Sequence, residues 1–267
     1  MRYESSDASI PKDKKGRVIK KILLVIGVLV LVLGAFMIYW LNDGYDPMEE
    51  ALGSLESSEE VAVYTQDRWI HFQPGEELDN REVSTGFIYY PGGKVDHRSY
   101  APLMHALALE GVEGFLVEMP LDLAILGSNR GEAIIENYPN IDRWIISGHS
   151  LGGAMAGRFA YNHPELVDGV VFFAAYPASS NDLSDFENLS VLSIYGDRDG
   201  FVTDENIESS REYVPGNTRW LEIEGGNHSQ FGYYGFQDGD LEAEISREEQ
   251  QRQIIKEILQ WLEEGWE

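Results

Sequence analysis

The chain has 267 residues, of which 43% are hydrophobic, and its 46 acidic residues against 20 basic ones give a formal net charge of −26 at pH 7. This length is enough for one sizeable folded domain, whereas the acidic charge argues against binding to nucleic acid, whose phosphates attract basic surfaces. Because cysteine is absent, disulfides, thiolate metal ligands and a cysteine nucleophile are excluded.

An uncharged apolar run of 19 residues, 22–40, follows the N-terminal tail. As a helix with about 1.5 Å per residue, it nearly matches the roughly 30 Å thickness of a bilayer core. Seven basic residues and three acidic ones precede it, so the positive-inside rule puts the N-terminus in the cytoplasm and the later residues outside. We expect a single-pass cell-membrane protein with a cytoplasmic basic tail, residues 1–21, and a transmembrane helix, residues 22–41, that also acts as signal anchor.

A cleaved signal peptide is the alternative interpretation of this run. The apolar stretch of a signal peptide is usually about 7 to 15 residues long, with small residues at the cleavage site. Here the run is longer and ends in bulky side chains that include Tyr39 and Trp40, which suit a membrane interface. The sequence therefore favours a retained anchor, although it leaves open whether the helix is ever cleaved.

The segment after the helix, residues 42–60, is polar and acidic. Asp46 and Pro47 can start a short helix at most. We therefore predict an acidic stalk over this segment and a folded domain over residues 61–267.

Short β-rich runs alternate with helix-length segments through the rest of the chain. Apolar strands separated by segments that can cross back as helices predict an α/β fold with a mostly parallel sheet covered on both faces. Helical apolar spacing is present in residues 100–109 and 151–162 and from Arg247 onward. The predicted strands are residues 61–65, 68–72, 86–90, 114–119, 143–148, 169–176, 191–196 and 219–224.

One predicted strand leads into the sequence Gly148-His149-Ser150-Leu151-Gly152, and a helix rich in small residues follows. A strand, a G-x-S-x-G turn and a helix, in this order, form the context of a nucleophile elbow. Because the turn strains the serine backbone, Gly148 and Gly152 must lack bulk. We predict Ser150 as a nucleophile at a helix N-terminus, where developing negative charge is stabilised. The alternative is a glycine-lined turn that holds an inert serine.

A serine nucleophile needs a base that accepts its proton, and the base needs an acid that fixes its tautomer. His228 follows the last predicted strand and Asp199 follows the strand before it, so the chain order is serine, acid, histidine. Both loops are expected at the carboxyl ends of sheet strands, where open α/β sheets bind ligands. We predict Asp199 and His228 as the catalytic partners of Ser150, with Asp197 as the alternative acid.

Together these motifs resemble the α/β-hydrolase superfamily, in particular a small bacterial and plant group labelled dienelactone hydrolase-like or carboxymethylenebutenolidase-like. True dienelactone hydrolases use a cysteine nucleophile, which this chain lacks. The resemblance therefore implies an α/β-hydrolase fold and the hydrolysis of an ordinary ester, thioester or lactone. The matching segments are residues 90–96, 119–124, 148–153, 193–200 and 225–232.

The resemblance also implies an oxyanion hole made by two backbone N–H groups. One belongs to the residue after the nucleophile, Leu151, and the other to the loop after the third strand. That loop usually reads His-Gly-x in the family and reads Pro91-Gly92-Gly93 here, so Gly93 is the candidate donor. The alternative is that these three residues form only a tight turn.

Lids in this fold are commonly inserted after the sixth strand, where only residues 177–190 are available. This segment is too short for a cap domain, so we predict an open, shallow pocket. Asp238 and Asp240 resemble part of a calcium loop, but the remaining ligand spacing is missing. We therefore expect no metal and no cofactor.

These expectations define a membrane-anchored, extracytoplasmic serine hydrolase that cleaves a small-molecule acyl substrate through an acyl-enzyme intermediate. One alternative is an acyltransferase that uses the same triad, and another is a catalytically silent binding module with the same fold. No nucleic-acid partner is expected. The sequence does not define the natural substrate, the acyl length or the oligomeric state.

Overall fold

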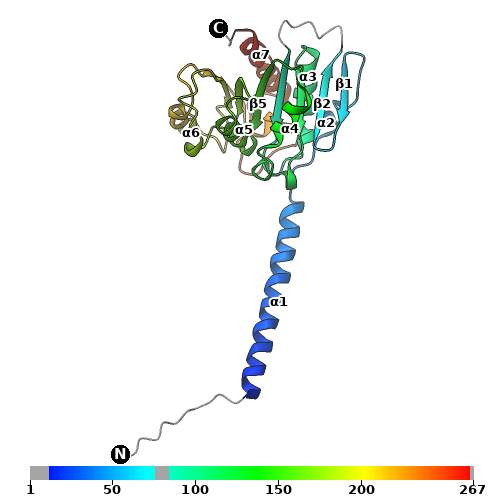
Figure 1. The fold of residues 1–267 in the computed structure, drawn as a ribbon, viewed down its shortest axis with the longest axis vertical. Helices are drawn as coiled ribbons and strands as arrows, with labels where there is room; N and C mark the ends of the chain where they lie inside the picture. Colours follow the sequence, from blue (N-terminus) through cyan, green and yellow to red (C-terminus); the bar gives the residue numbers. More distant parts are fainter. Residues whose placement is uncertain (1–11, 76–83, 265–267) are drawn as a thin grey trace, which may run out of the picture. The chain divides into compact units, whose positions relative to one another are not determined.

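The computed structural model describes residues 12–75 and 84–264 (Figure 1). The chain divides into two units, Met1–Gly44 and Tyr45–Glu267. The first unit contains helix α1, Lys12–Asn42, whose segment Gly16–Met37 is long and apolar enough to cross a membrane. A signal sequence has similar properties, so the helix agrees with the predicted anchor by length and composition only.

The second unit, which we call the compact unit, is built on one eight-stranded sheet. Its strands are β1 (Val61–Thr65), β2 (Trp69–Pro74), β3 (Thr85–Tyr90), β4 (Glu113–Val117), β5 (Arg143–His149), β6 (Gly169–Phe173), β7 (Ser190–Gly196) and β8 (Arg219–Ile223). They are arranged in the order β1-β2-β4-β3-β5-β6-β7-β8. β2 pairs antiparallel with β1 and β4, and all other pairs are parallel. The carboxyl ends of β3 to β8 therefore meet at one edge of the sheet, which we call the carboxyl edge.

Helices cover both faces of this sheet (Figure 1). They are α2 (Glu49–Gly53), α3 (Ala101–Leu109), α4 (Arg130–Asn137), α5 (Leu151–Asn162), α6 (Asp204–Ser210) and α7 (Arg247–Glu264). Successive side chains of a strand point to opposite faces. Accordingly, Phe87 and Tyr89 of β3 pack in one apolar cluster with α3 and α7, whereas Ile88 and Tyr90 pack in another with α4 and α5. The predicted α/β fold is confirmed, and all eight predicted strands are present, with ends that differ from the prediction by at most three residues.

The connection between β6 and β7 is short. It contains one 3₁₀ turn, Ser179–Asn181, and no α-helix or strand. This connection therefore carries no cap domain, as the sequence predicts.

The segment predicted as a stalk, residues 42–60, belongs mostly to the compact unit, which begins at Tyr45. Tyr45 forms a β-bridge with Val95, and Ala51 in α2 is fully buried, with 0% of its surface exposed. The boundary differs from the prediction because a few apolar side chains dock this acidic segment against residues that are distant in the chain. The folded part therefore begins before Val61.

Replacing Ala51 by aspartate should destabilise the compact unit, because the new charge would be buried without a partner. We expect the free energy of unfolding of the full chain in detergent to fall by about 2–4 kcal/mol, measured by denaturant titration. Leu52→Asp is the matched control, since Leu52 is 41% exposed, and it should change the value by less than about 0.5 kcal/mol. An equal loss in both variants would contradict docking of this segment.

Candidate active site

Ser150 lies between β5 and α5 with a strained backbone. Its φ of 52° and ψ of −120° are rarely adopted by a residue that has a Cβ. Its N–H donates to the carbonyl oxygen of Phe173 in β6 (3.0 Å), which holds the turn on the sheet. The serine is partly exposed at the N-terminus of α5. This is the geometry of a nucleophile elbow.

The two glycines of the motif allow close backbone approaches. A Cβ at Gly148 would lie 2.4 Å from the carbonyl carbon of Gly152, and a Cβ at Gly152 would lie 2.2 Å from the carbonyl oxygen of Tyr90. Both distances are far below van der Waals contact, so no side chain fits at either position. As a result, α5 begins directly against the carboxyl ends of β3 and β5.

Gly93 and Leu151, the predicted oxyanion donors, lie next to each other. A Cβ at Gly93 would lie 3.2 Å from Cδ2 of Leu151. The N–H of the preceding Gly92 already donates to Oη of Tyr100 (3.1 Å). Within the described ranges, 12–75 and 84–264, the N–H groups of Gly93 and Leu151 have no acceptor. Two backbone donors beside Ser150 are thus available to a developing oxyanion.

Asp199 and His228 form a buried hydrogen-bonded pair. Oδ2 of Asp199 lies 2.7 Å from Nδ1 of His228, and the two side chains are 0% and 1% exposed. Oδ1 of Asp199 accepts from the N–H groups of Phe201 and Val202, both at 2.7 Å. The carboxylate is therefore fixed on one side by its own loop and on the other by the imidazole.

Asp197, the alternative acid, has a different partner. Its Oδ1 accepts from the N–H of Gly225 (2.7 Å), and the residue is exposed. This hydrogen bond links the loops after β7 and β8. The structure thus brings Asp199, and not Asp197, to His228.

The second ring nitrogen of His228, Nε2, is buried and has no hydrogen-bond partner among the described residues. The structure therefore has no hydrogen bond between Oγ of Ser150 and His228. The imidazole packs against the rings of His149, with 4.3 Å between centroids, and Phe201, with 4.9 Å. Because Nδ1 is bonded to Asp199, Nε2 is the nitrogen that remains to accept a proton.

His149, the variable residue of the G-x-S-x-G turn, is a buried neighbour of His228 that the sequence does not predict. Its Nδ1 lies 2.9 Å from Oη of Tyr100, and this oxygen also accepts from the N–H of Gly92. Burial lowers the pKa of His149 well below its ordinary value, and the nearby His228 lowers this pKa further. A neutral His149 therefore supports the His228 ring and adds no positive charge beside it.

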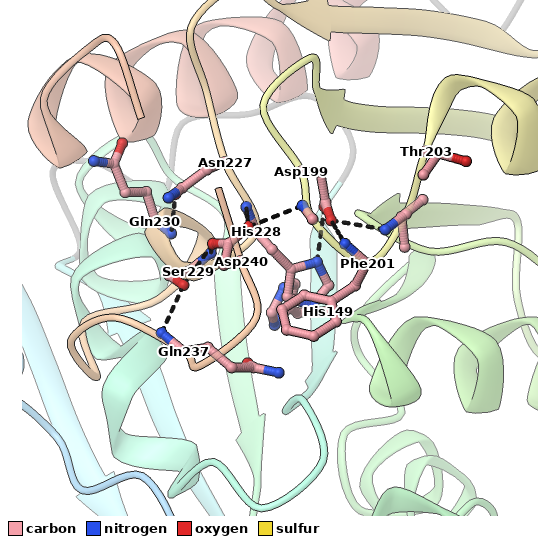
Figure 2. A network of polar contacts seen from close by, with 12 residues as sticks. His149, Asp199, Phe201, Thr203, Asn227, His228, Ser229, Gln230, Gln237 and Asp240 are labelled. Carbon is pink, nitrogen blue, oxygen red and sulfur yellow. Dashed lines mark hydrogen bonds and ion pairs between the residues drawn. The ribbon is translucent and has the colours of Figure 1, made fainter. Parts of the chain in front are cut away.

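Asp240 is a second residue of the site that the sequence does not predict. Its Oδ1 accepts from the N–H groups of Gly200 (3.0 Å) and His228 (3.4 Å), and its Oδ2 accepts from the N–H (2.8 Å) and Oγ (2.6 Å) of Ser229. Figure 2 shows Asp240 beside Ser229 and His228, with Asp199 on the far side of the imidazole. Since Gly200 follows Asp199, one buried carboxylate ties the loop of the acid to the loop of the histidine.

The chain belongs to the alpha/beta hydrolase family, whose sequence model matches residues 86–252. This range includes Ser150, Asp199 and His228 and most of the sheet. The protein is therefore a hydrolase of this family. No curated protein sequence matches the chain.

Several solved structures share the fold of this chain at low sequence identity. Est1E from Butyrivibrio proteoclasticus is 14% identical, with a TM-score of 0.53, over 77% of this chain and 100% of its own. A structure of ferulic acid bound to Est1E is 13% identical, with a TM-score of 0.54, over 76% of this chain and 96% of its own. A predicted CIB-like hydrolase from Thermoplasma acidophilum is 16% identical, with a TM-score of 0.52, over 74% of this chain and 98% of its own. At these identities the likeness supports the fold alone.

Asp199→Asn and Asp197→Asn together test which carboxylate supports the histidine. Loss of the Asp199 charge should lower kcat on a short-chain ester about 10³- to 10⁴-fold, because the imidazole loses its orienting and stabilising partner. Asp197→Asn, which alters a hydrogen bond away from the imidazole, should change kcat less than about threefold. A larger loss in Asp197→Asn would assign the acid to Asp197.

Asp240→Asn should weaken the link between the two loops, because an amide has only one accepting oxygen and the donors face both oxygens of the carboxylate. We expect the free energy of unfolding to fall by about 1–3 kcal/mol and kcat to fall about 10- to 100-fold through misplacement of His228. The matched control is Asp238→Asn, at an exposed position two residues earlier, which should leave both values unchanged. The structural role of Asp240 is excluded if the two variants behave alike in unfolding and kinetic assays.

Proposed function

We propose that the protein is a membrane-anchored serine hydrolase that cleaves a small carboxylic ester, thioester or lactone outside the cytoplasm. The observation that carries this proposal is the buried 2.7 Å hydrogen bond between Asp199 and His228, whose imidazole packs against His149, the residue directly before the strained Ser150. A hydroxyl, an acid and a histidine in this chain order form the triad of serine hydrolases with this fold. The resemblance to the dienelactone hydrolase-like group stays a prediction and supports a small substrate.

In the first half of the proposed reaction, Oγ of Ser150 attacks the carbonyl carbon of the substrate and its proton passes to Nε2 of His228. Asp199 stabilises the imidazolium that forms. The N–H groups of Gly93 and Leu151 donate to the oxyanion of the tetrahedral intermediate. When the intermediate collapses, the bond to the leaving group breaks, and the leaving alcohol or thiol takes the proton from His228.

In the second half, water attacks the acyl group on Ser150 and gives a proton to His228. A second oxyanion forms and collapses, the carboxylic acid leaves, and the proton returns to Oγ of Ser150. The net reaction consumes one water and restores the enzyme. Attack by an alcohol in place of water would give acyl transfer with the same triad.

The location outside the cytoplasm rests on helix α1 and the charges beside it. Seven basic and three acidic residues precede the apolar run, which favours a cytoplasmic N-terminus. The exposed apolar surface of Gly16–Met37, of which 0% is buried within the protein, is stable in a bilayer and costly in water. The catalytic unit then follows the helix on the outer side.

A catalytically silent binding module with the same fold is the second candidate. It is favoured by one observation, the absence of a hydrogen bond from His228 Nε2 to any described residue, Ser150 included. Catalytic hydrogen bonds are often long in unliganded enzymes and shorten when substrate binds. For this reason we prefer the hydrolase.

Labelling with a fluorophosphonate probe distinguishes the two candidates. An activated Ser150 should displace fluoride and form a covalent bond to phosphorus, detected by fluorescence in a gel and by mass spectrometry of the peptide. Ser150→Ala should abolish labelling, whereas Ser209→Ala, at an exposed serine in α6, should label like the wild type. A folded wild-type protein that does not react would support the silent module.

A further inference from the structure

The first residues of the compact unit are built into the carboxyl edge, beside the proposed oxyanion loop. The N–H of Tyr45 donates to the carbonyl oxygen of Lys94 (2.8 Å), and the N–H of Asp96 donates to the carbonyl oxygen of Tyr45 (3.0 Å). Lys94 directly follows Gly93. The chain therefore enters the compact unit next to one of the proposed oxyanion donors.

The same segment also contacts the loop that carries His228. The rings of Tyr45 and Tyr234 have centroids 5.6 Å apart, and Oη of Tyr234 donates to the carbonyl oxygen of His228 (3.4 Å). In addition, the N–H of Met48 donates to the carbonyl oxygen of Tyr233 (2.8 Å). The entry point of the chain is thus packed against both loops that would act on the substrate.

The connection from α1 to this entry point is very short. Only Asp43 and Gly44 separate Asn42, the last residue of α1, from Tyr45. Three Cα-to-Cα steps of 3.8 Å cannot exceed about 11 Å. The Cα atom of Asn42 therefore lies no more than about 11 Å along the chain from that of Tyr45.

Most exposed large apolar side chains of the compact unit lie in loops that begin at this edge. Among the described residues from Tyr45 onward, nine large hydrophobic side chains are exposed, and six of them lie in loops that leave the carboxyl ends of β4, β7 and β8. Their concentration at one edge of an acidic protein favours contact with an apolar partner. The six residues are Leu121, Ile125, Leu126, Phe201, Phe236 and Leu241.

We propose that the substrate of this site is an uncharged acyl ester held in the membrane, which reaches Ser150 from the bilayer surface. This inference rests on the proposed function and on the anchor. The formal net charge of −26 repels anionic lipid headgroups, so a neutral ester fits better than an anionic one. Hydrolysis consumes one water and releases a carboxylic acid and an alcohol. No cap domain is inserted between β6 and β7, so no lid has to open before a substrate enters. In this proposal, proximity to the bilayer gives the site access to the ester.

Lengthening the tether tests this proposal in the full chain, reconstituted into phosphatidylcholine vesicles. The two probes are a long-chain 4-methylumbelliferyl ester, which partitions into the vesicles, and the water-soluble acetate. A flexible Gly/Ser insertion of about 20 residues between Asp43 and Gly44 adds a root-mean-square span of about 25 Å. We expect the insertion to lower the rate of hydrolysis of the vesicle-held ester at least about fivefold, because it lowers the effective concentration of this ester at the site. The rate of acetate hydrolysis should stay within about twofold of the wild-type rate.

A double variant tests the apolar edge with the same probes. Ile125→Ser with Leu126→Ser should lower the ratio of the vesicle-held rate to the acetate rate. Tyr161→Ser is the matched control, because Tyr161 is 40% exposed but lies in the last turn of α5, which begins directly after Ser150 and leads away from it. This control should keep the wild-type ratio.

The outcomes separate this inference from the proposed function. Hydrolysis of the acetate with no response of the vesicle-held rate to the insertion would overturn the membrane-held substrate and leave the serine hydrolase in place. A wild-type protein that cleaves the acetate but not the vesicle-held ester would likewise overturn the membrane-held substrate and leave the serine hydrolase in place. A folded protein that cleaves neither ester and does not react with fluorophosphonate would overturn both.

Discussion

Burial of the Asp199 carboxylate against the His228 imidazole is the constraint on which the rest of the site depends. A buried carboxylate is costly unless hydrogen bonds compensate it, and here Phe201, Val202 and His228 all contact it at 2.7 Å. Because Asp199 follows β7 and His228 follows β8, this pair fixes two neighbouring loops relative to each other. It also leaves Nε2 of the ring without a hydrogen-bond partner among the residues that the structure describes.

The surrounding backbone keeps those loops close together. A Cβ at Gly196 would lie 2.3 Å from the carbonyl oxygen of Gly226, so the ends of β7 and β8 approach as only glycine permits. Asp240 then links both loops through its two oxygens. The elbow at Ser150 has a strained backbone, and its hydrogen bond to β6 holds it on the sheet. Strain of this kind persists only where the surrounding packing determines it.

The parts of this arrangement that depend on local pattern can be predicted from the sequence. The strands are short apolar runs. Ser150 lies in a motif in which steric crowding of the turn requires the two glycines. Asp240 has no such signal, because its sequence context does not distinguish it from Asp238. What distinguishes Asp240 is the set of N–H groups that donate to it, and these belong to residues earlier in the chain. Docking of Tyr45 likewise depends on Val95 and Tyr234, far along the chain. For this reason the sequence of residues 42–60, which is acidic and has few apolar residues, predicts a stalk.

The account depends most directly on whether the free nitrogen of His228 can reach the oxygen of Ser150. A crystal structure of the protein with a phosphonate bound to Ser150 measures this. We expect Nε2 within about 2.6–3.2 Å of an oxygen of the adduct, and the phosphonyl oxygen about 2.7–3.1 Å from the backbone nitrogens of Gly93 and Leu151. An imidazole that stays bonded to Asp199 but out of reach of the adduct would contradict the proposed triad.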